Sequence, residues 1–197
     1  MKDLRKTPYV IAELANVHGG DISIIENLIE RFASLKYKKK GIKFQIFAPD
    51  KIALSDFSWY EVYKELYIDS VQWRMLLRKA KVAGDVWLDI FDAYGVEVLS
   101  ENMEIVSGIK LQASVVNNYE VRAALKNLDF RAKSIILNVS GLDVSEAQKS
   151  VSYFEEYFEK VIVQFGFQSY PTKVEDTGRG SYFLPLLALH PIPYVYE

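Results

Sequence analysis

Residues Pro8 to Asp21, PYVIAELANVHGGD, guide the interpretation of the whole chain. Residues 9–14 are almost continuously apolar, which is typical of a parallel strand buried on both faces. Glu13 interrupts this run, and a carboxylate within a buried strand needs a partner or a function. We therefore expect Glu13 near the carboxyl end of the strand, pointing into a cleft. A plain salt bridge is the alternative interpretation.

Polar residues follow directly after this strand. Asn16, His18 and a pair of glycines predict a turn that brings an amide and an imidazole to the same strand end. Asp21 or Ser23 is expected to cap the next helix. For His18 the alternative is a loop histidine that is hydrogen-bonded to backbone. Taken together with Glu13, these residues predict a site at the junction of strand and loop.

Composition and charge exclude several function classes. The chain has 197 residues, of which 50% are hydrophobic and 25% charged, and its net charge is −2. These values describe a globular protein without a global field that would draw it to nucleic acid or an anionic membrane. The absence of cysteine excludes disulfides, thiol nucleophiles and Cys-ligated metal. Without an apolar signal segment or a membrane span, a soluble cytoplasmic protein is expected.

Predicted strands and helices alternate along the chain. The strands are expected at 9–14, 41–47, 85–91, 107–113, 134–139, 161–165 and 193–197, and the helices at 22–35, 71–83, 93–99, 119–125, 144–158 and 184–189. This alternation predicts right-handed parallel units and an α/β fold. No glycine-rich dinucleotide fingerprint follows the first strand, so a (β/α)8 TIM-barrel type is preferred over an open sheet.

The predicted barrel is incomplete at its C-terminus. A closed eight-stranded barrel needs about 250 residues, and this chain stops near the seventh predicted strand. One barrel domain over residues 1–197 is therefore expected.

Charged residues on the second and third predicted strands are further site candidates. Lys43 and Gln45 share the polar side of their strand, and Lys43 could pair with Glu13 or bind an anion. Asp89 and Asp92 come at the carboxyl end of the third strand, where paired acids bind metal or cap a helix. Capping is the preferred interpretation for Asp92.

Two other clusters have simpler interpretations. Lysines at 36 and 38–40 fall at the expected end of a helix, where cations complement the helix dipole. The aromatic-rich insertion at 49–73 has only two basic residues, Lys51 and Lys64, among its aromatic side chains, so a packed lid or an oligomer surface is preferred over a nucleic-acid platform.

The order of these residues resembles that of the sialic acid synthases, which include the related legionaminic and pseudaminic acid synthases. The family signature A-E-I-G-x-N-H-x-G-D is similar to residues 12–21. The family's K-F-Q recurs at 43–45, its Y-P-T at 170–172, and its fourth-strand lysine at Lys110. The similarity covers nearly the whole chain, with the motifs in register.

The resemblance implies condensation of phosphoenolpyruvate with an N-acyl hexosamine of the N-acetylmannosamine type. Phosphate and a nine-carbon 2-keto sugar acid would be the products. Glu13 would contact the sugar and assist proton transfer, and Lys43 and Lys110 would hold the phosphate and carboxylate of phosphoenolpyruvate. The other substrate-binding positions carried over are Gln45, Tyr170, Asn16 and His18.

The chain departs from the family pattern at several of these positions. Asp89 replaces a threonine near the phosphate, and an acid beside a dianion repels it. The family's S-T-G reads V-S-G here, which leaves Ser140 and removes one phosphate-contacting serine. The serine after Lys110 falls on Ala113 or, with a one-residue bulge, on Ser114. Gln168 ends the run FGFQ that replaces H-C-x-N/S.

The family also uses a divalent cation, usually manganese or magnesium, as a Lewis acid on the sugar's aldehyde oxygen. Its metal-binding histidines and its small C-terminal antifreeze-like domain, which reaches a partner's active site, would follow Glu197. We therefore expect no metal ligands in this chain, and a homodimer.

Two alternatives to the synthase function stay open. Asp89 with Glu13 could serve another aldolase-like reaction on a sugar phosphate or other anion. A barrel protein with a degraded site could instead act without catalysis in surface-polysaccharide biosynthesis.

Overall fold

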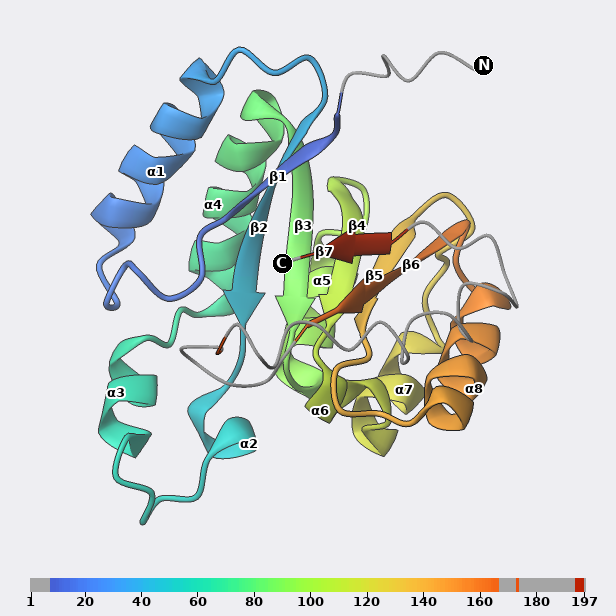
Figure 1. Ribbon diagram of the computed structural model, residues 1–197. Helices are drawn as coiled ribbons and strands as arrows, with labels where there is room; N and C mark the ends of the chain where they lie inside the picture. The colour runs from blue at the N-terminus through green and yellow to red at the C-terminus, as the bar shows by residue number, and fades with distance from the viewer. Residues whose placement is uncertain (1–7, 167–172, 174–193, 197) are drawn as a thin grey trace. The chain divides into compact units, whose positions relative to one another are not determined.

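The computed structural model describes residues 8–166, 173 and 194–196 (Figure 1). The chain divides into two compact units, Met1–Ser107 (unit 1) and Gly108–Glu197 (unit 2). Each unit combines parallel strands with helices that connect them along the chain.

Unit 1 contains a parallel sheet whose neighbouring strands follow one another in chain order. Its strands are β1 (Val10–Glu13), β2 (Lys40–Ile46) and β3 (Asp85–Ile90). Its helices are α1 (Ile22–Ser34), α2 (Pro49–Ile52), α3 (Tyr60–Glu65), α4 (Ser70–Ala83) and α5 (Ala93–Glu101). The register pairs Glu13 with Lys43 and Gln45 with Asp89.

The two faces of this sheet differ in polarity because side chains alternate along a strand. One face is fully buried and apolar, with side chains from β2 and β3: Ile42, Phe44, Ile46, Val86, Leu88 and Ile90. Figure 1 shows α1 and α4 side by side along this sheet. Glu13, Lys43 and Asp89 share the opposite face, as their register requires. The predicted polar side of the second strand is therefore confirmed.

Helix α1 is capped at both ends by charged side chains. The Asp21 carboxylate accepts from Ser23 N at 2.8 Å, which confirms Asp21 as the N-cap. At the other end, Lys40 Nζ donates to the carbonyl oxygens of Phe32, Ala33 and Leu35 at 2.7, 2.8 and 2.9 Å. These bonds satisfy terminal carbonyls and place a cation at the negative end of the dipole. The interpretation of the basic run as a helix end is confirmed at Lys40.

A separate polar cluster lies at the amino ends of β1 and β3. The Tyr9 hydroxyl donates to Asp85 Oδ2 at 2.8 Å and accepts from Trp87 Nε1 at 2.9 Å. Gly41 lies directly beside these rings, since a Cβ there would come within 2.8 Å of Trp87 and of the Tyr9 hydroxyl. The Tyr9, Asp85 and Trp87 side chains bond to one another, and the space beside Gly41 is filled. This cluster therefore links the strands and does not form a binding site.

Unit 2 repeats the parallel arrangement. Strand β4 (Val106–Leu111) begins in the last residues of unit 1 and continues into unit 2. It pairs with β5 (Ser134–Asn138), and β5 pairs with β6 (Lys160–Phe165). Strand β6 also pairs with β7 (Tyr194–Tyr196). The helices are α6 (Ala113–Val116), α7 (Tyr119–Leu125) and α8 (Val144–Glu155). Asp143 and Glu146 form a capping box at the start of α8.

The α/β class and the parallel pairing are confirmed within each unit. Consecutive neighbours follow the chain order, as in a barrel, whereas a doubly wound sheet reverses its order at a switch point. A closed eight-stranded barrel and a single domain over 1–197 stay predictions. The predicted helix at 184–189 lies outside the described residues.

Several predicted boundaries differ from those of the structure, and two of them concern the ends of elements in unit 2. The fourth strand ends at Leu111 rather than Ala113, because the chain turns into α6 directly afterwards. The helix expected at 144–158 ends at Glu155, where Glu156 forms its C-cap. No helix in the described part of the chain has both the length and the apolar character needed to cross a bilayer.

Candidate functional site

The central feature of unit 1 is a lysine between two carboxylates. Lys43 Nζ lies 2.6 Å from Glu13 Oε2 and 3.7 Å from Asp89 Oδ2, on the polar face of the sheet. The Lys43 and Asp89 side chains are 6% and 0% exposed, whereas Glu13 is 36% exposed. The prediction that Lys43 pairs with Glu13 is confirmed, and its role as an anion ligand stays a prediction.

Because Lys43 and Asp89 are buried, the stability of each charged side chain depends on its charged neighbours. An ammonium group in a poorly solvated position is stable only with charge partners, and removing one partner leaves an uncompensated charge. Glu13 is the member that solvent reaches. It is therefore the carboxylate of this cluster that an incoming molecule can contact first.

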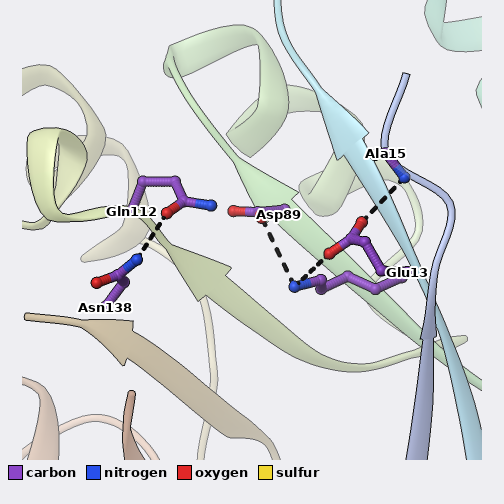
Figure 2. Close-up of polar contacts among 6 residues, drawn as sticks. Glu13, Ala15, Asp89, Gln112 and Asn138 are labelled. Atoms are coloured by element: carbon purple, nitrogen blue, oxygen red, sulfur yellow. Dashed lines mark hydrogen bonds and ion pairs between the residues drawn. The ribbon is translucent and has the colours of Figure 1, made fainter. Parts of the chain in front are cut away.

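The turn after β1 fixes the Glu13 carboxylate. Glu13 Oε1 accepts from Ala15 N at 3.1 Å, while Oε2 contacts Lys43, so both oxygens are engaged (Figure 2). Ala15 has a φ of +42°, in the left-handed region that glycine adopts most easily. The family signature has glycine at this position, and the chain keeps the turn with alanine.

His18 is held inside the same loop. It is 4% exposed, and its Nδ1 accepts from Gly20 N at 2.9 Å, which places the ring proton on Nε2. Burial lowers the pKa of His18, so the imidazole is neutral near pH 7. The alternative interpretation of His18 as a loop histidine bonded to backbone is therefore confirmed at Nδ1. A role in substrate binding stays a prediction.

The loop also contacts the aromatic insertion. Gly20, with φ +87°, leaves no space for a Cβ, which would lie 2.1 Å from the Glu65 carbonyl oxygen at the end of α3. The buried Asn16 Oδ1 in the same loop accepts no hydrogen bond from any residue that the structure describes. A role of Asn16 in substrate binding stays a prediction.

The remaining predicted residues of unit 1 have clear positions. Gln45 is half-buried and is the register partner of Asp89, so it shares the face of the lysine cluster. Asp92 caps α5, accepting from Gly95 N at 3.0 Å and from Ala48 N at 2.6 Å. Capping is thus confirmed for Asp92. Burial raises the pKa of its carboxyl group.

The described residues do not fit a divalent cation. No three His, Asp or Glu side chains within 8–166, 173 and 194–196 gather as metal ligands would. Glu13 and Asp89, the two carboxylates on the polar face, both contact Lys43. A cation there would meet an ammonium group, so no chemical step is assigned to a metal here.

The aromatic insertion is packed in part and exposed in part. Tyr63 stacks on Phe57 and contacts Phe47 edge-on, with ring centroids 6.2 and 5.9 Å apart. Trp59 is nevertheless 60% exposed, and Leu54 is exposed as well. Both predicted interpretations, lid and oligomer surface, stay open.

Unit 2 has its own polar cluster at the carboxyl ends of its strands. Lys110, Asn138, Ser140 and Gln164 are all buried. Asn138 Nδ2 donates to Gln112 Oε1 at 3.0 Å (Figure 2), and Asn138 Oδ1 accepts from Ser140 N at 2.9 Å. These bonds fix the orientation of the Asn138 amide.

Three members of this cluster, Gln112, Asn138 and Gln164, were not expected from the sequence. Asn138 and Gln164 are register partners, and Gln112 lies two positions after Lys110. A polar residue near the carboxyl end of consecutive strands, or directly after it as for Gln112 at the N-cap of α6, is the signal that could have identified them.

Other predicted residues lie apart or outside. Ser114 is exposed in the first turn of α6, next to the half-buried Ala113. Gln168 and Tyr170 lie outside the described residues. Unit 1 therefore brings Glu13, Lys43 and Asp89 into contact, and unit 2 holds Lys110 and Ser140.

No family model matches the chain, and no curated protein matches it in sequence. Among solved structures, the chain is similar to N-acetylneuraminic acid (sialic acid) synthetase from Leptospira borgpetersenii serovar Hardjo-bovis. The TM-score is 0.80 at 20% identity, over 97% of this chain and 65% of that one. It is also similar to the spore coat polysaccharide biosynthesis protein SpsE of Bacillus subtilis, with a TM-score of 0.73 at 17% identity, over 95% of this chain and 52% of that one.

This chain thus spans less than two thirds of the length of either relative. The resemblance to the sialic acid synthases that the motifs indicate is confirmed as a likeness of fold.

Proposed function

We propose that this chain is the barrel portion of a sialic acid synthase-like enzyme, which joins phosphoenolpyruvate to an N-acyl hexosamine. The observation that carries the proposal is the contact between Glu13 and Lys43. These two residues stand at the family's A-E and K-F-Q positions. They meet where Glu13 ends β1 beside Lys43 on the neighbouring parallel strand, and the carboxyl ends of strands are where β/α barrels build active sites. The shared fold supports the proposal.

In the proposed reaction, the methylene carbon of phosphoenolpyruvate bonds to the aldehyde carbon of the sugar. Water adds at the former enol carbon, and phosphate leaves, giving a 2-keto sugar acid. Glu13 is reachable from solvent, and its carboxylate is the group assigned to contact the sugar and assist proton transfer. Lys43 supplies a fixed positive charge for the anionic substrate. Lys110 keeps the role that the resemblance implies.

Asp89 imposes a cost on the binding of an anion. Its carboxylate lies 3.7 Å from Lys43 Nζ and is fully buried, so part of the lysine's field is already compensated. A phosphate dianion at Lys43 would be repelled by this carboxylate. We therefore expect weaker binding of phosphoenolpyruvate than with the family's threonine.

The same observation favours a second candidate function. A buried acid next to the anion-binding lysine suits a substrate with less negative charge, as in another aldolase-like reaction on a sugar derivative. A non-catalytic barrel protein of surface-polysaccharide biosynthesis is the remaining alternative, and it would bind neither substrate.

Phosphate release separates the synthase function from the two alternatives. The full-length protein, with any segment that follows Glu197, is incubated with phosphoenolpyruvate, a panel of N-acyl hexosamines and manganese, because the family uses a divalent cation whose ligands are expected beyond Glu197. We expect release that depends on the sugar and is lost in Glu13→Gln. No release above this variant with any sugar would remove the synthase claim. A cytoplasmic homodimer belongs to the same proposal, and gel filtration tests the dimer.

A further inference from the structure

The buried polar cluster of unit 2 contains two atoms that have no hydrogen-bond partner among the residues that the structure describes. Gln164 and Ser140 are 4% and 6% exposed. Neither the Gln164 Oε1 atom nor the Ser140 Oγ atom forms a hydrogen bond with any described residue. Such atoms are costly to leave unpaired in a folded protein, so each calls for a partner beyond the described residues.

The polar groups next to these two atoms already form hydrogen bonds with other residues. The Asn138 amide bonds to Gln112 and to Ser140 N, so it cannot turn to serve Gln164. Gln164 is the register partner of Asn138 and therefore projects from the same face of the sheet. Gly166 approaches Ser140 closely, with a Cβ there 3.5 Å from Ser140 Oγ.

We propose that Gln164 and Ser140 form a binding subsite for a hydroxyl or amide N–H group on an uncharged part of the substrate. The side-chain carbonyl of Gln164 can only accept a hydrogen bond, so its partner must be a donor. The phosphate and carboxylate of phosphoenolpyruvate are acceptors when ionised and cannot supply one. The hydroxyls and the N-acyl N–H of an amino sugar can.

The choice of an amino sugar as the ligand rests on the proposed function. The new element is that Gln164 distinguishes this sugar from other sugars. A pocket built to pair a donor rejects an analogue that lacks the donor more strongly than an apolar pocket does. Gln164 is thus a specificity-determining residue for the sugar, in a position where none was expected from the family motifs.

The test compares two probes, N-acetylmannosamine and phosphoenolpyruvate, by calorimetry without turnover. Gln164→Met keeps the approximate size of the side chain and removes the orphan carbonyl. We expect it to weaken N-acetylmannosamine binding about tenfold, the change in Kd for one lost hydrogen bond. Binding of phosphoenolpyruvate should stay the same.

Stability gives an independent readout. Because the removed carbonyl has no partner in the described chain, Gln164→Met should raise the Tm of the ligand-free protein by about 2–4 °C. Ser140→Ala, which removes the second orphan atom, should likewise weaken sugar binding without lowering the Tm. Gln148→Met, on the half-buried face of α8, is the matched control and should change neither quantity.

Four results would overturn the subsite: no binding of N-acetylmannosamine to the wild-type chain, unchanged sugar binding in both variants, selective loss of phosphoenolpyruvate binding, or a lowered Tm in Gln164→Met. Failure of the proposed function looks different. In that case the sugar binds and depends on Gln164, but no phosphate is released.

Discussion

Lys43 and Glu13 are register partners on neighbouring parallel strands, and their charged groups meet at 2.6 Å. The contact links the two family motifs that lie 30 positions apart in the chain, since Glu13 and Lys43 each belong to one of them. Asp89 on the next strand adds a second, fully buried carboxylate at 3.7 Å. The function of unit 1 therefore depends on whether a substrate anion can compete with Glu13 and Asp89 for interaction with Lys43.

Replacing the lysine should destabilise the fold. Lys43→Met leaves the buried Asp89 carboxylate without this cation, and we expect a loss of roughly 3 kcal/mol in the free energy of unfolding. Urea denaturation measures it. Lys64→Met is the matched control, because Lys64 pairs with Glu61 on the exposed surface, where the expected change is below about 0.5 kcal/mol. Equal losses of unfolding free energy in the two variants would show that the buried Lys43 does not stabilise the fold through its charge.

Replacing the buried acid should strengthen anion binding. Asp89→Thr removes the carboxylate that competes for Lys43, and we expect phosphoenolpyruvate to bind about tenfold more tightly. Calorimetry gives the Kd, with Asp56→Thr in an exposed loop as the control. Unchanged or weaker binding in Asp89→Thr would mean that Asp89 does not oppose the anion.

The strained turn offers a stabilising change. Ala15 adopts φ +42°, so Ala15→Gly should raise the free energy of unfolding by about 0.5–1 kcal/mol, since relief of strain exceeds the entropy cost of glycine. The matched control is Ala123→Gly on the exposed face of α7, which should lower it by about as much. Thermal melts compare the two. A loss in both variants would show that the turn carries no strain.

His18 should make stability depend on pH. Its pKa is lowered by burial, so the unfolded chain binds a proton more readily than the folded one. The His18 contribution to the free energy of unfolding is therefore complete above the ordinary histidine pKa of about 6.5 and falls as pH decreases below it. Denaturation of wild type and His18→Gln between pH 8 and 5 measures the difference. Parallel curves would contradict a neutral, buried imidazole.

Much of unit 1 follows from sequence pattern alone. The apolar run before Glu13 and the alternation around Lys43 predict both strands and the face on which they meet. Asp92 and Asp21 are identified as caps because an acid before an apolar helical pattern has a well-defined role. These features depend on residues that are close together in the chain, so a single sequence is enough to predict them.

The errors concern features that depend on three-dimensional context. The fourth strand is predicted to run to Ala113, whereas the structure ends it at Leu111 and begins α6 at Ala113, a boundary that tertiary packing decides. Gln164 looked unremarkable within VIVQF, since its meaning comes from its register with Asn138. Register between strands that are distant in sequence cannot be read from spacing alone.

The most direct test of the account follows the carbon atoms. Phosphoenolpyruvate labelled with carbon-13 at its methylene position is incubated with the full-length protein, manganese and N-acetylmannosamine, and the products are examined by NMR. We predict a new carbon–carbon bond between the labelled carbon and the sugar with wild type, and none with Glu13→Gln. Labelled pyruvate without such a bond, or no turnover with any N-acyl hexosamine, would contradict the account.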